Sequence, residues 1–347
     1  MPFFQQFPKT SYDFGSNGID TTIVDLFRFV KANDKFFDDI LTYQYFEVRN
    51  GDRPDIVSNL IYGTPDYYWT FFIINEHLKS GISGWPMNQD EMDEYFVSEY
   101  PGQVIETRPI IVRDGDGLIT EHRNSLANRF TIGETITGLL SGARGKVMSK
   151  DANLSQLVIT PIRQSRITLN TADFSNYYTQ GESISMTLPD GKIRSAEIVH
   201  VDIDGSLVVE YITGTFTVGK NLVGAISGCS RAFASIVELD LVFQDDELIV
   251  GNLSASQVTI YKVWDRPDAP HHYELADGSI YYNPIHISEQ NSTAGNDPTI
   301  TTGGLTAVSN RAYEIDVNDQ RGNIRVVRPQ SIYKFVQMYQ ALINNNG

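Results

Sequence analysis

The sequence predicts an α+β protein in which an all-β region separates a small mixed domain from a C-terminal strand and helix. Helical and strand periodicities alternate through the first hundred residues. Between residues 130 and 258, short Val, Ile and Thr runs alternate with Gly, Asn and Asp turns. The last sixteen residues return to helical spacing. We therefore divide the chain into an N-terminal arm with a small α/β domain (1–129), an inserted all-β region (130–258) and a C-terminal segment (259–347).

Composition limits the classes of function. The 347 residues carry a formal net charge of −16, which argues against binding nucleic acid or an anionic membrane, since both need clustered Lys and Arg. Cys229 is the single cysteine, so neither an intrachain disulfide nor a Cys-rich zinc site is expected. No secretory signal and no apolar run of membrane-spanning length is recognised, and the chain fits assembly in a reducing cytoplasm.

Two helices are predicted near the N-terminus, after an extended opening arm. The first begins at Asp20, a good N-cap, and continues through an apolar stripe that includes Ile23, Leu26 and Phe27. A second short helix covers 36–41.

A strand, two helices and a closing strand follow. The aromatic run 43–48 predicts the first strand, and a turn at 50–52 leads to a helix that begins at Pro54 and ends at Gly63. The next helix runs from Thr64 to Asn75. Residues 85–87 are expected to supply the closing strand.

An acidic helix follows this closing strand. Asn88 and Glu91 form a predicted capping pair, with Met92, Tyr95 and Phe96 facing inward. Asp90, Asp93 and Glu94 form its other face, which we interpret as solvated.

The all-β region contains an internal repeat. Phe130-Thr-Ile-Gly-Glu134 leads to Ser141-Gly142, and Phe216-Thr-Val-Gly-Lys220 leads to Ser227-Gly228 at the same spacing. A possible further copy begins at Tyr178. Each module is too short for a large core, so the modules are expected to pack on one another.

The C-terminal segment is predicted to contain an exposed loop, a strand and a helix. Residues 289–304 are polar and rich in Asn, Ser, Thr and Gly, which is typical of a loop. Residues 324–327 alternate as a strand, and a helix capped by Ser331 carries a wide apolar stripe.

No motif predicts catalysis, a metal site or a cofactor. The run 141–146 lacks the spacing and the Ser or Thr of a phosphate loop, and the Asp-Gly runs at 114–117 and 202–205 lack the Glu of a calcium loop. His271 and His272 are adjacent, and adjacent strand residues face opposite sides, so a shared metal ion is not expected. The prediction is a protein that is not an enzyme.

Aromatic residues are the candidates for an interface. Trp69 and Trp85 lie in aromatic surroundings, where core packing is the default interpretation and an interface role for Trp85 is the alternative. The candidate interface residues are Tyr62, Trp69, Trp85, Phe335 and Tyr339.

Two resemblances rest on this region. The segment 45–75, with Gly51-Asp52, Tyr62-Gly63, Pro65, Trp69 and Asn75, resembles a LysM module, although Arg53 stands where Thr or Ser is usual. The longer stretch 56–100, together with Asp25-Leu-Phe-Arg28 and the C-terminal run from Tyr313 to the last helix, is similar to the LysM-like baseplate wedge subunit of T-even-type contractile-tailed phages. The β-repeat region interrupts this second resemblance as an apparent insertion.

The resemblance implies a structural function in the virion. Such a subunit joins neighbouring wedges into the sixfold baseplate, with other wedge proteins and sheath-initiating or hub-proximal tail proteins as partners. It has no catalytic residues. The alternative implied by the LysM module is binding of peptidoglycan, a polymer that contains N-acetylglucosamine. A glycosidase or peptidase remains a third interpretation, for which the sequence places no acid and base pair.

Overall fold

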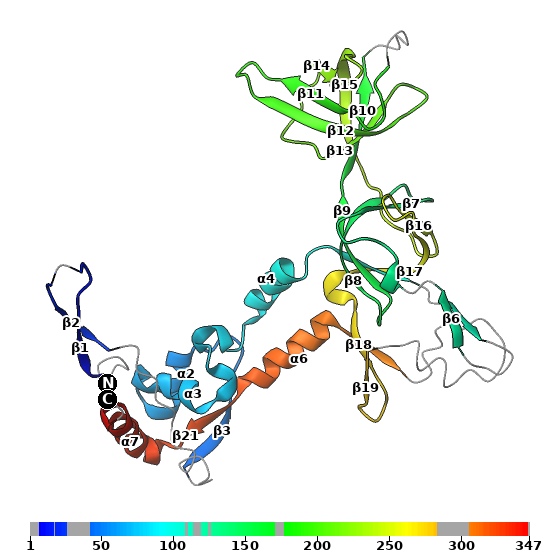
Figure 1. Ribbon diagram of the computed structural model, residues 1–347. Coiled ribbons are helices and arrows are strands. Elements are labelled where there is room, and N and C mark those ends of the chain that lie inside the picture. Colours follow the sequence, from blue (N-terminus) through cyan, green and yellow to red (C-terminus); the bar gives the residue numbers. More distant parts are fainter. Residues whose placement is uncertain are drawn as a thin grey trace. The chain divides into compact units, whose positions relative to one another are not determined.

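The computed structural model describes residues 7–16, 18–25, 42–107, 110–113, 119–123, 126–170, 177–282 and 305–345. The chain forms two compact units. Unit 1 comprises 1–99 and 311–347, and unit 2 comprises 100–310. Unit 2 is therefore one continuous segment between the two parts of unit 1. The predicted α+β class is confirmed, with the main helices in unit 1 and both barrels in unit 2 (Figure 1).

The chain begins with a hairpin where a helix was predicted. Strand β1 (Lys9–Tyr12) pairs antiparallel with β2 (Thr21–Val24). The predicted helix start at Asp20 is therefore wrong, because all four residues of β2 are β-branched and favour extended backbone. The rest of that predicted helix, from Leu26, and the predicted helix at 36–41 lie outside the described residues, as do residues 1–6 and 17 of the opening arm.

The next elements of unit 1 follow the predicted order. Strand β3 (Tyr43–Glu47) precedes α2 (Pro54–Tyr62), which ends at Gly63 with a φ of 73°. Glycine suits this left-handed cap because it has no Cβ. The predicted second helix is divided into the 3₁₀ turn η2 (Pro65–Tyr67) and α3 (Trp69–Ile74).

The closing strand comes from the far end of the chain. β3 pairs antiparallel with β21 (Asn323–Val327), placing Phe46 opposite Ile324 (Figure 1). The prediction that residues 85–87 form this strand is wrong. They lie in a loop after the turns η3 (Glu76–Leu78) and η4 (Gly81–Gly84). β21 takes the position because its residues Ile324, Val326 and Val327 are all fully buried there.

Three helices complete unit 1. Helix α4 (Gln89–Glu99) begins with the predicted capping pair, and α6 (Asn310–Gly322) was not predicted. After η7 (Pro329–Ser331), α7 (Ile332–Asn345) buries four residues of its predicted stripe: Ile332, Phe335, Tyr339 and Ile343.

Two apolar clusters form the core of unit 1, and β21 contributes to both. Val327 packs with Trp69, Ile74 and the buried residues of α7. Ile324 and Val326 pack in the second cluster, whose other buried members are Val57, Phe71, Leu78 and Trp85.

Unit 2 contains two closed six-stranded barrels. Barrel 1 has the strand order β16-β17-β4-β9-β8-β7, and barrel 2 has the order β10-β13-β12-β11-β14-β15. The strands of barrel 1 are β4 (Gln103–Thr107), β7 (Thr135–Gly138), β8 (Arg144–Asp151), β9 (Gln156–Ile162), β16 (Leu248–Gly251) and β17 (Gln257–Asp265). Those of barrel 2 are β10 (Gln164–Leu169), β11 (Ser183–Thr187), β12 (Ile193–Val201), β13 (Leu207–Glu210), β14 (Asn221–Gly224) and β15 (Ser230–Leu239).

Barrel 2 is nested inside barrel 1 in the sequence. Its strands occupy 164–239, between β9 and β16 of barrel 1. Barrel 1 also needs β4, which precedes the predicted boundary at 129/130, and β17, which crosses the boundary at 258/259. Both predicted boundaries therefore lie inside unit 2, because strand pairing joins segments that composition separates.

The remaining described strands of unit 2 form small sheets. β18 (Pro270–Glu274) pairs with β19 (Ile280–Tyr281) and β20 (Thr306–Ser309), and β5 (Ile110–Arg113) pairs with β6 (Ile119–Arg123). Short 3₁₀ turns occur at 126–128 (η5) and 266–268 (η6). The predicted turn at 114–117 and loop at 289–304 lie outside the described residues. No helix in the described part of the chain is long and apolar enough to cross a membrane.

The repeat can be followed along both barrels as four copies, two in each barrel. The copies begin at Phe130, Tyr178, Phe216 and Phe243. The fourth was not predicted, because Asp246 replaces the glycine and Ala255 follows the serine. Both residues adopt positive φ, 66° and 51°, as Gly133 and the other glycines at these positions do. Each barrel has its own buried core, so the predicted packing of one module on the next occurs within each barrel.

A buried glutamate in the repeat closes each of three hairpins. Glu134 accepts hydrogen bonds from the backbone of Leu253 and Ser254 and from Ser254 Oγ. Glu247 does the same reciprocally for Leu140 and Ser141. In barrel 2, Glu182 accepts from the backbone of Ile226 and Ser227. We call each of these arrangements a glutamate clasp.

A glycine eight residues after the start of a copy makes room for each clasp. A Cβ on Gly138 would lie 2.5 Å from Glu247 Oε2, and a Cβ on Gly251 would lie 2.7 Å from Glu134 Oε2. The Tyr178 copy has Met186 at this position, and its partner copy has the exposed Lys220 in place of the glutamate. The one copy without this glycine is therefore the copy whose partner has no glutamate to form a clasp.

Asn75 joins α3 to β21, and its loss should loosen unit 1. Its amide donates to Phe71 O (2.8 Å) and Arg325 O (2.9 Å), and its Oδ1 accepts from Arg325 N (2.8 Å). We expect Asn75→Ala to lower the free energy of unfolding of unit 1 by about 2 kcal/mol, because the three backbone groups of Phe71 and Arg325 lose their hydrogen-bond partners. Hydrogen exchange read by mass spectrometry should then be roughly 30-fold faster across β21. Asn59→Ala, an exposed change on α2, should leave exchange unaltered, and equal effects would contradict this role.

Glu134→Gln should open barrel 1. The amide NH2 cannot accept from Leu253 and Ser254, and we expect a cost of about 3 kcal/mol, measured as faster exchange over 251–256. Lys220→Gln, at the matching position without a clasp, should change little. Burial raises the pKa of Glu134, but hydrogen bonds from Ser254, Thr131 and Leu253 outweigh it and hold the pKa below the ordinary 4.5.

This lowered pKa gives the clasp a predicted pH dependence. The clasp stabilises the folded state above pH 4.5, and this stabilisation is lost as pH falls through the lower folded pKa. The difference in free energy of unfolding between the wild type and Glu134→Gln should therefore become smaller in acid. A difference that stays constant from pH 7 to pH 3 would contradict the role given to the Glu134 clasp.

Candidate functional site

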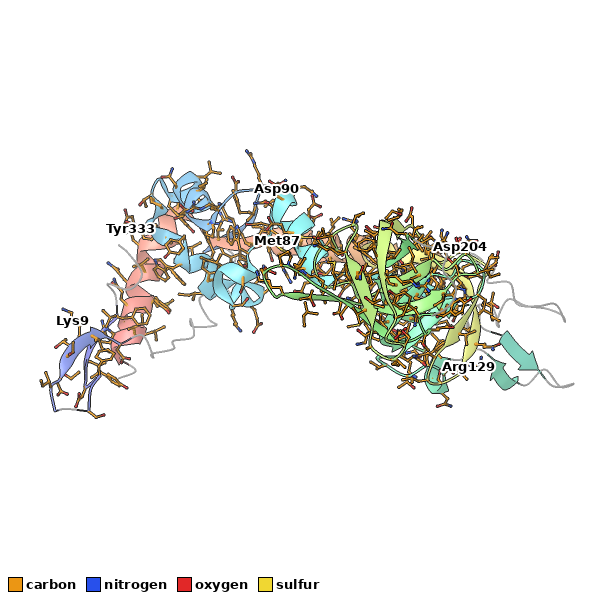
Figure 2. The ribbon with its side chains drawn as sticks, turned by 90° about the horizontal axis from the view of Figure 1, so that it is seen from above. Lys9, Met87, Asp90, Arg129, Asp204 and Tyr333 are labelled. Atoms are coloured by element: carbon orange, nitrogen blue, oxygen red, sulfur yellow. The ribbon has the colours of Figure 1, made fainter. Side chains whose placement is uncertain are left out.

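A pocket of unit 1 lies beside the start of α4. It has a volume of about 700 Å³. Two segments form most of its wall: 51–55, which covers the turn after β3 and the first residues of α2, and 82–88, which covers the end of η4 and the loop before α4. Tyr68 and Glu91 complete the lining. Figure 2 marks the region by Met87 and Asp90 at the N-terminal end of α4.

Hydrogen bonds hold the two segments of the pocket together. Trp85 Nε1 donates to Asp52 O at 2.8 Å, and Gln89 N donates to Asn50 Oδ1 at 3.2 Å. Asn318 of α6 bonds both the N–H and the carbonyl of Met87, at 2.8 and 3.0 Å. The pocket is therefore built into the fold of unit 1.

The predicted capping pair forms one edge of the pocket. Asn88 N donates to Glu91 Oε2 and Glu91 N donates to Asn88 Oδ1, both at 2.9 Å. This reciprocal arrangement satisfies two of the free N–H groups at the start of α4. The predicted solvated face is also confirmed, since Asp90, Asp93 and Glu94 are all exposed.

The pocket lining combines apolar residues with carboxylates, and we call the carboxylates its acidic rim. Tyr68, Trp85, Pro86 and Met87 provide apolar surface, and Ile82 is 76% exposed. Asp52, Asp55 and Glu91 provide three carboxylates, and Arg53 provides one cation, which pairs with Asp55 at 3.2 Å. The arrangement can bind an apolar group flanked by positive charge.

The predicted interface residues lie largely inside unit 1. Trp69, Phe335 and Tyr339 form one aromatic group, with the Trp69 and Tyr339 ring centroids 5.3 Å apart. All three are buried, and Tyr62 is partly buried with its hydroxyl donating to Val327 O at 2.8 Å. Burial raises the pKa of Tyr62 far above its ordinary value, although hydrogen bonds with Thr70 and Val327 oppose the rise.

Trp85 is the candidate that reaches the pocket. It is only 7% exposed, and its ring packs against Phe71 and Phe72 at 6.0 and 5.9 Å. The direct interface role of the five aromatic residues stays a prediction. Sequence reasoning did not single out Asp55 or Ile82, whereas Asp52 and Asn318 fall within the two family resemblances. The capping pair and the acidic face were the signals that point to this edge of unit 1.

The adjacent histidines do not face opposite sides as predicted. His271 Nδ1 lies 2.8 Å from His272 Nδ1, and His272 Nε2 lies 3.2 Å from Glu274. A register shift in β18 between Pro270 and His272 disrupts the regular alternation and brings the rings together. Within the described residues, no group of three or more His, Cys, Asp or Glu side chains is placed to hold a metal ion.

A buried carboxyl group in barrel 1 is fully engaged by neighbours. Glu106 accepts from Trp264 Nε1 at 3.0 Å and from the Tyr273 hydroxyl at 3.2 Å. Burial raises its pKa, and the hydrogen bonds from Trp264 and Tyr273 and the charge of Lys262 partly oppose this rise. These contacts give Glu106 a structural role that joins β4, β17 and β18.

Comparison with known families identifies the kind of protein. Residues 2–106 match the family model described as base plate wedge protein 53. The matched range contains β3, α2, α3, α4 and the loops that form the pocket. No curated protein sequence matches the chain. The chain is a structural component of the phage tail baseplate, not an enzyme, and its partners are other baseplate proteins.

Proposed function

We propose that the chain joins neighbouring wedges into the sixfold baseplate through unit 1. The family match, which covers most of the N-terminal part of unit 1, carries this proposal. A closed ring of identical wedges needs contacts between two different surfaces of neighbouring copies. Other wedge proteins are the proposed contacts, together with sheath-initiating or hub-proximal tail proteins.

Unit 1 is proposed to be a LysM-like module whose second strand is supplied from the C-terminus. The order β3, α2, α3 and β21, with β3 and β21 paired antiparallel, supports this. In this proposal the five predicted aromatic residues act indirectly, by packing α3, α7 and β21 together inside unit 1.

Binding of peptidoglycan is the weaker alternative. A sugar ring stacks on an exposed aromatic face, whereas Trp69 and Trp85 are both buried. Trp85 also uses its ring N–H within unit 1. Fold likeness by itself does not establish a ligand.

Copy number in the particle tests the wedge proposal. Quantitative mass spectrometry of purified tails should find this chain in a multiple of six, counted against the sheath and tube subunits. Absence or trace amounts would contradict the proposal. Binding of purified sacculi by the chain would instead support the alternative.

Unit 2 is proposed to be a peripheral insertion. Both ends of unit 2 meet at Arg266, since Arg266 N donates to Gly102 O and Asn310 Nδ2 donates to Arg266 O. In unit 1, the Arg311 guanidinium lies 4.7 Å from the centroid of the Phe96 ring, so its two parts also meet near the junction.

Replacing residues 101–309 by a short Gly-Ser linker should therefore leave unit 1 folded. The variant should keep wild-type hydrogen-exchange protection in β3 and β21. Deleting 130–258 should behave worse, because it removes β9 and β16 and leaves the β4–β17 pair with two unpaired edges. Loss of hydrogen-exchange protection in β3 and β21 when residues 101–309 are replaced would show instead that unit 2 supports unit 1.

A further inference from the structure

Building on the proposed joining function, we propose that the pocket beside α4 binds a short segment of another baseplate protein, one that presents an apolar side chain next to Lys or Arg. The pocket lies in the range that matches the family model. Two independent properties of its lining define this occupant: an exposed apolar surface and an unbalanced negative charge.

The apolar surface selects the side chain that enters. Ile82, which lines the pocket together with Tyr68, Pro86 and Met87, is 76% exposed. An aliphatic or aromatic side chain seated here would remove this surface from water, which is the main driving force of association. The loops are already held by Trp85 and Asn318, so little conformational freedom is lost on binding.

The charge selects what flanks that side chain. Asp52, Asp55 and Glu91 outnumber the one cation of the lining, Arg53. The exposed residues Asp90, Asp93 and Glu94 continue the negative charge along α4. The segment between Lys79 and Arg108 contains no Lys or Arg, and Arg311 of α6 packs on Phe96 of α4 and does not line the pocket. A segment with Lys or Arg gains favourable electrostatic energy at this rim, and an acidic segment is repelled.

The same features disfavour a peptidoglycan strand. Peptidoglycan carries free carboxylates on its stem peptides, and these would face the carboxylates of the rim. Trp85, one of the two aromatic residues of the lining, is only 7% exposed, and its ring packs against Phe71 and Phe72. A basic peptide fits the lining better on both counts.

Photo-crosslinking in assembled tails tests the proposal directly. Ile82→p-benzoylphenylalanine should crosslink to one baseplate protein, at a segment where Lys or Arg adjoins an apolar residue, identified by mass spectrometry. Val97→p-benzoylphenylalanine is the matched control, because Val97 is 78% exposed on α4 but does not line the pocket. Crosslinks to an acidic segment or to glycan, equal yields from both positions, or no crosslink from position 82 would overturn the proposal.

Two triple variants separate the pocket from the general charge of unit 1. Neutralising the rim should lower the crosslink yield from position 82 about 10-fold, through the lost attraction. That variant combines Asp52→Asn, Asp55→Asn and Glu91→Gln, and Gln at position 91 still suits the capping pair. The control removes the same charge outside the pocket, by Asp90→Asn, Asp93→Asn and Glu94→Gln, and should keep the yield within about 2-fold. Equal losses in the two variants would overturn the role of the rim.

The outcomes distinguish this proposal from the joining function on which it rests. If the copy number of the chain in purified tails is a multiple of six but position 82 forms no crosslink, the pocket proposal fails and the wedge proposal stands. If the chain is absent from purified tails, the joining function itself fails.

Discussion

The pairing of β3 with β21 is the constraint on which the rest of the structure depends. It joins residues about 280 positions apart, and backbone hydrogen bonds extend it to Val48 with Gly322 at one end and Thr42 with Arg328 at the other. β21 also supplies buried side chains to both apolar clusters of unit 1. The helices α2 and α3 thus lack a closed core until the C-terminus has been added. Closing so long a loop is entropically costly, and buried aromatic surface offsets the cost.

This constraint explains how the chain accommodates a large insertion. Unit 2 enters and leaves near one residue, Arg266, so it adds length to the β3–β21 connection without separating the paired strands. The same principle acts again inside unit 2, where barrel 2 lies between β9 and β16 of barrel 1. Reciprocal clasps by Glu134 and Glu247 tie the two copies of the repeat in barrel 1 across that interruption. Each level of nesting is closed by contacts between segments that are distant in sequence.

The pocket that we propose as a recognition surface is built from both parts of unit 1. Its shape depends on Asn318, which belongs to the C-terminal part of unit 1 and bonds the backbone of Met87. Its charge depends on carboxylates of the N-terminal part, Asp52, Asp55 and Glu91. Both parts of unit 1 must therefore come together before the surface exists. A surface completed by folding in this way is available for assembly only on a correctly folded subunit.

The sequence by itself determined the local features. The helix limits at Pro54 and Gly63, the Asn88 and Glu91 cap and the α7 stripe all follow from short-range backbone and periodicity rules, and each is confirmed. The tertiary structure alone decided which strands pair. It replaced the predicted closing strand at 85–87 by β21, turned the predicted helix start at Asp20 into β2, and placed β4 and β17 together in barrel 1. Strand partners are chosen by complementary burial between distant segments, and one strand's own residues do not encode that choice.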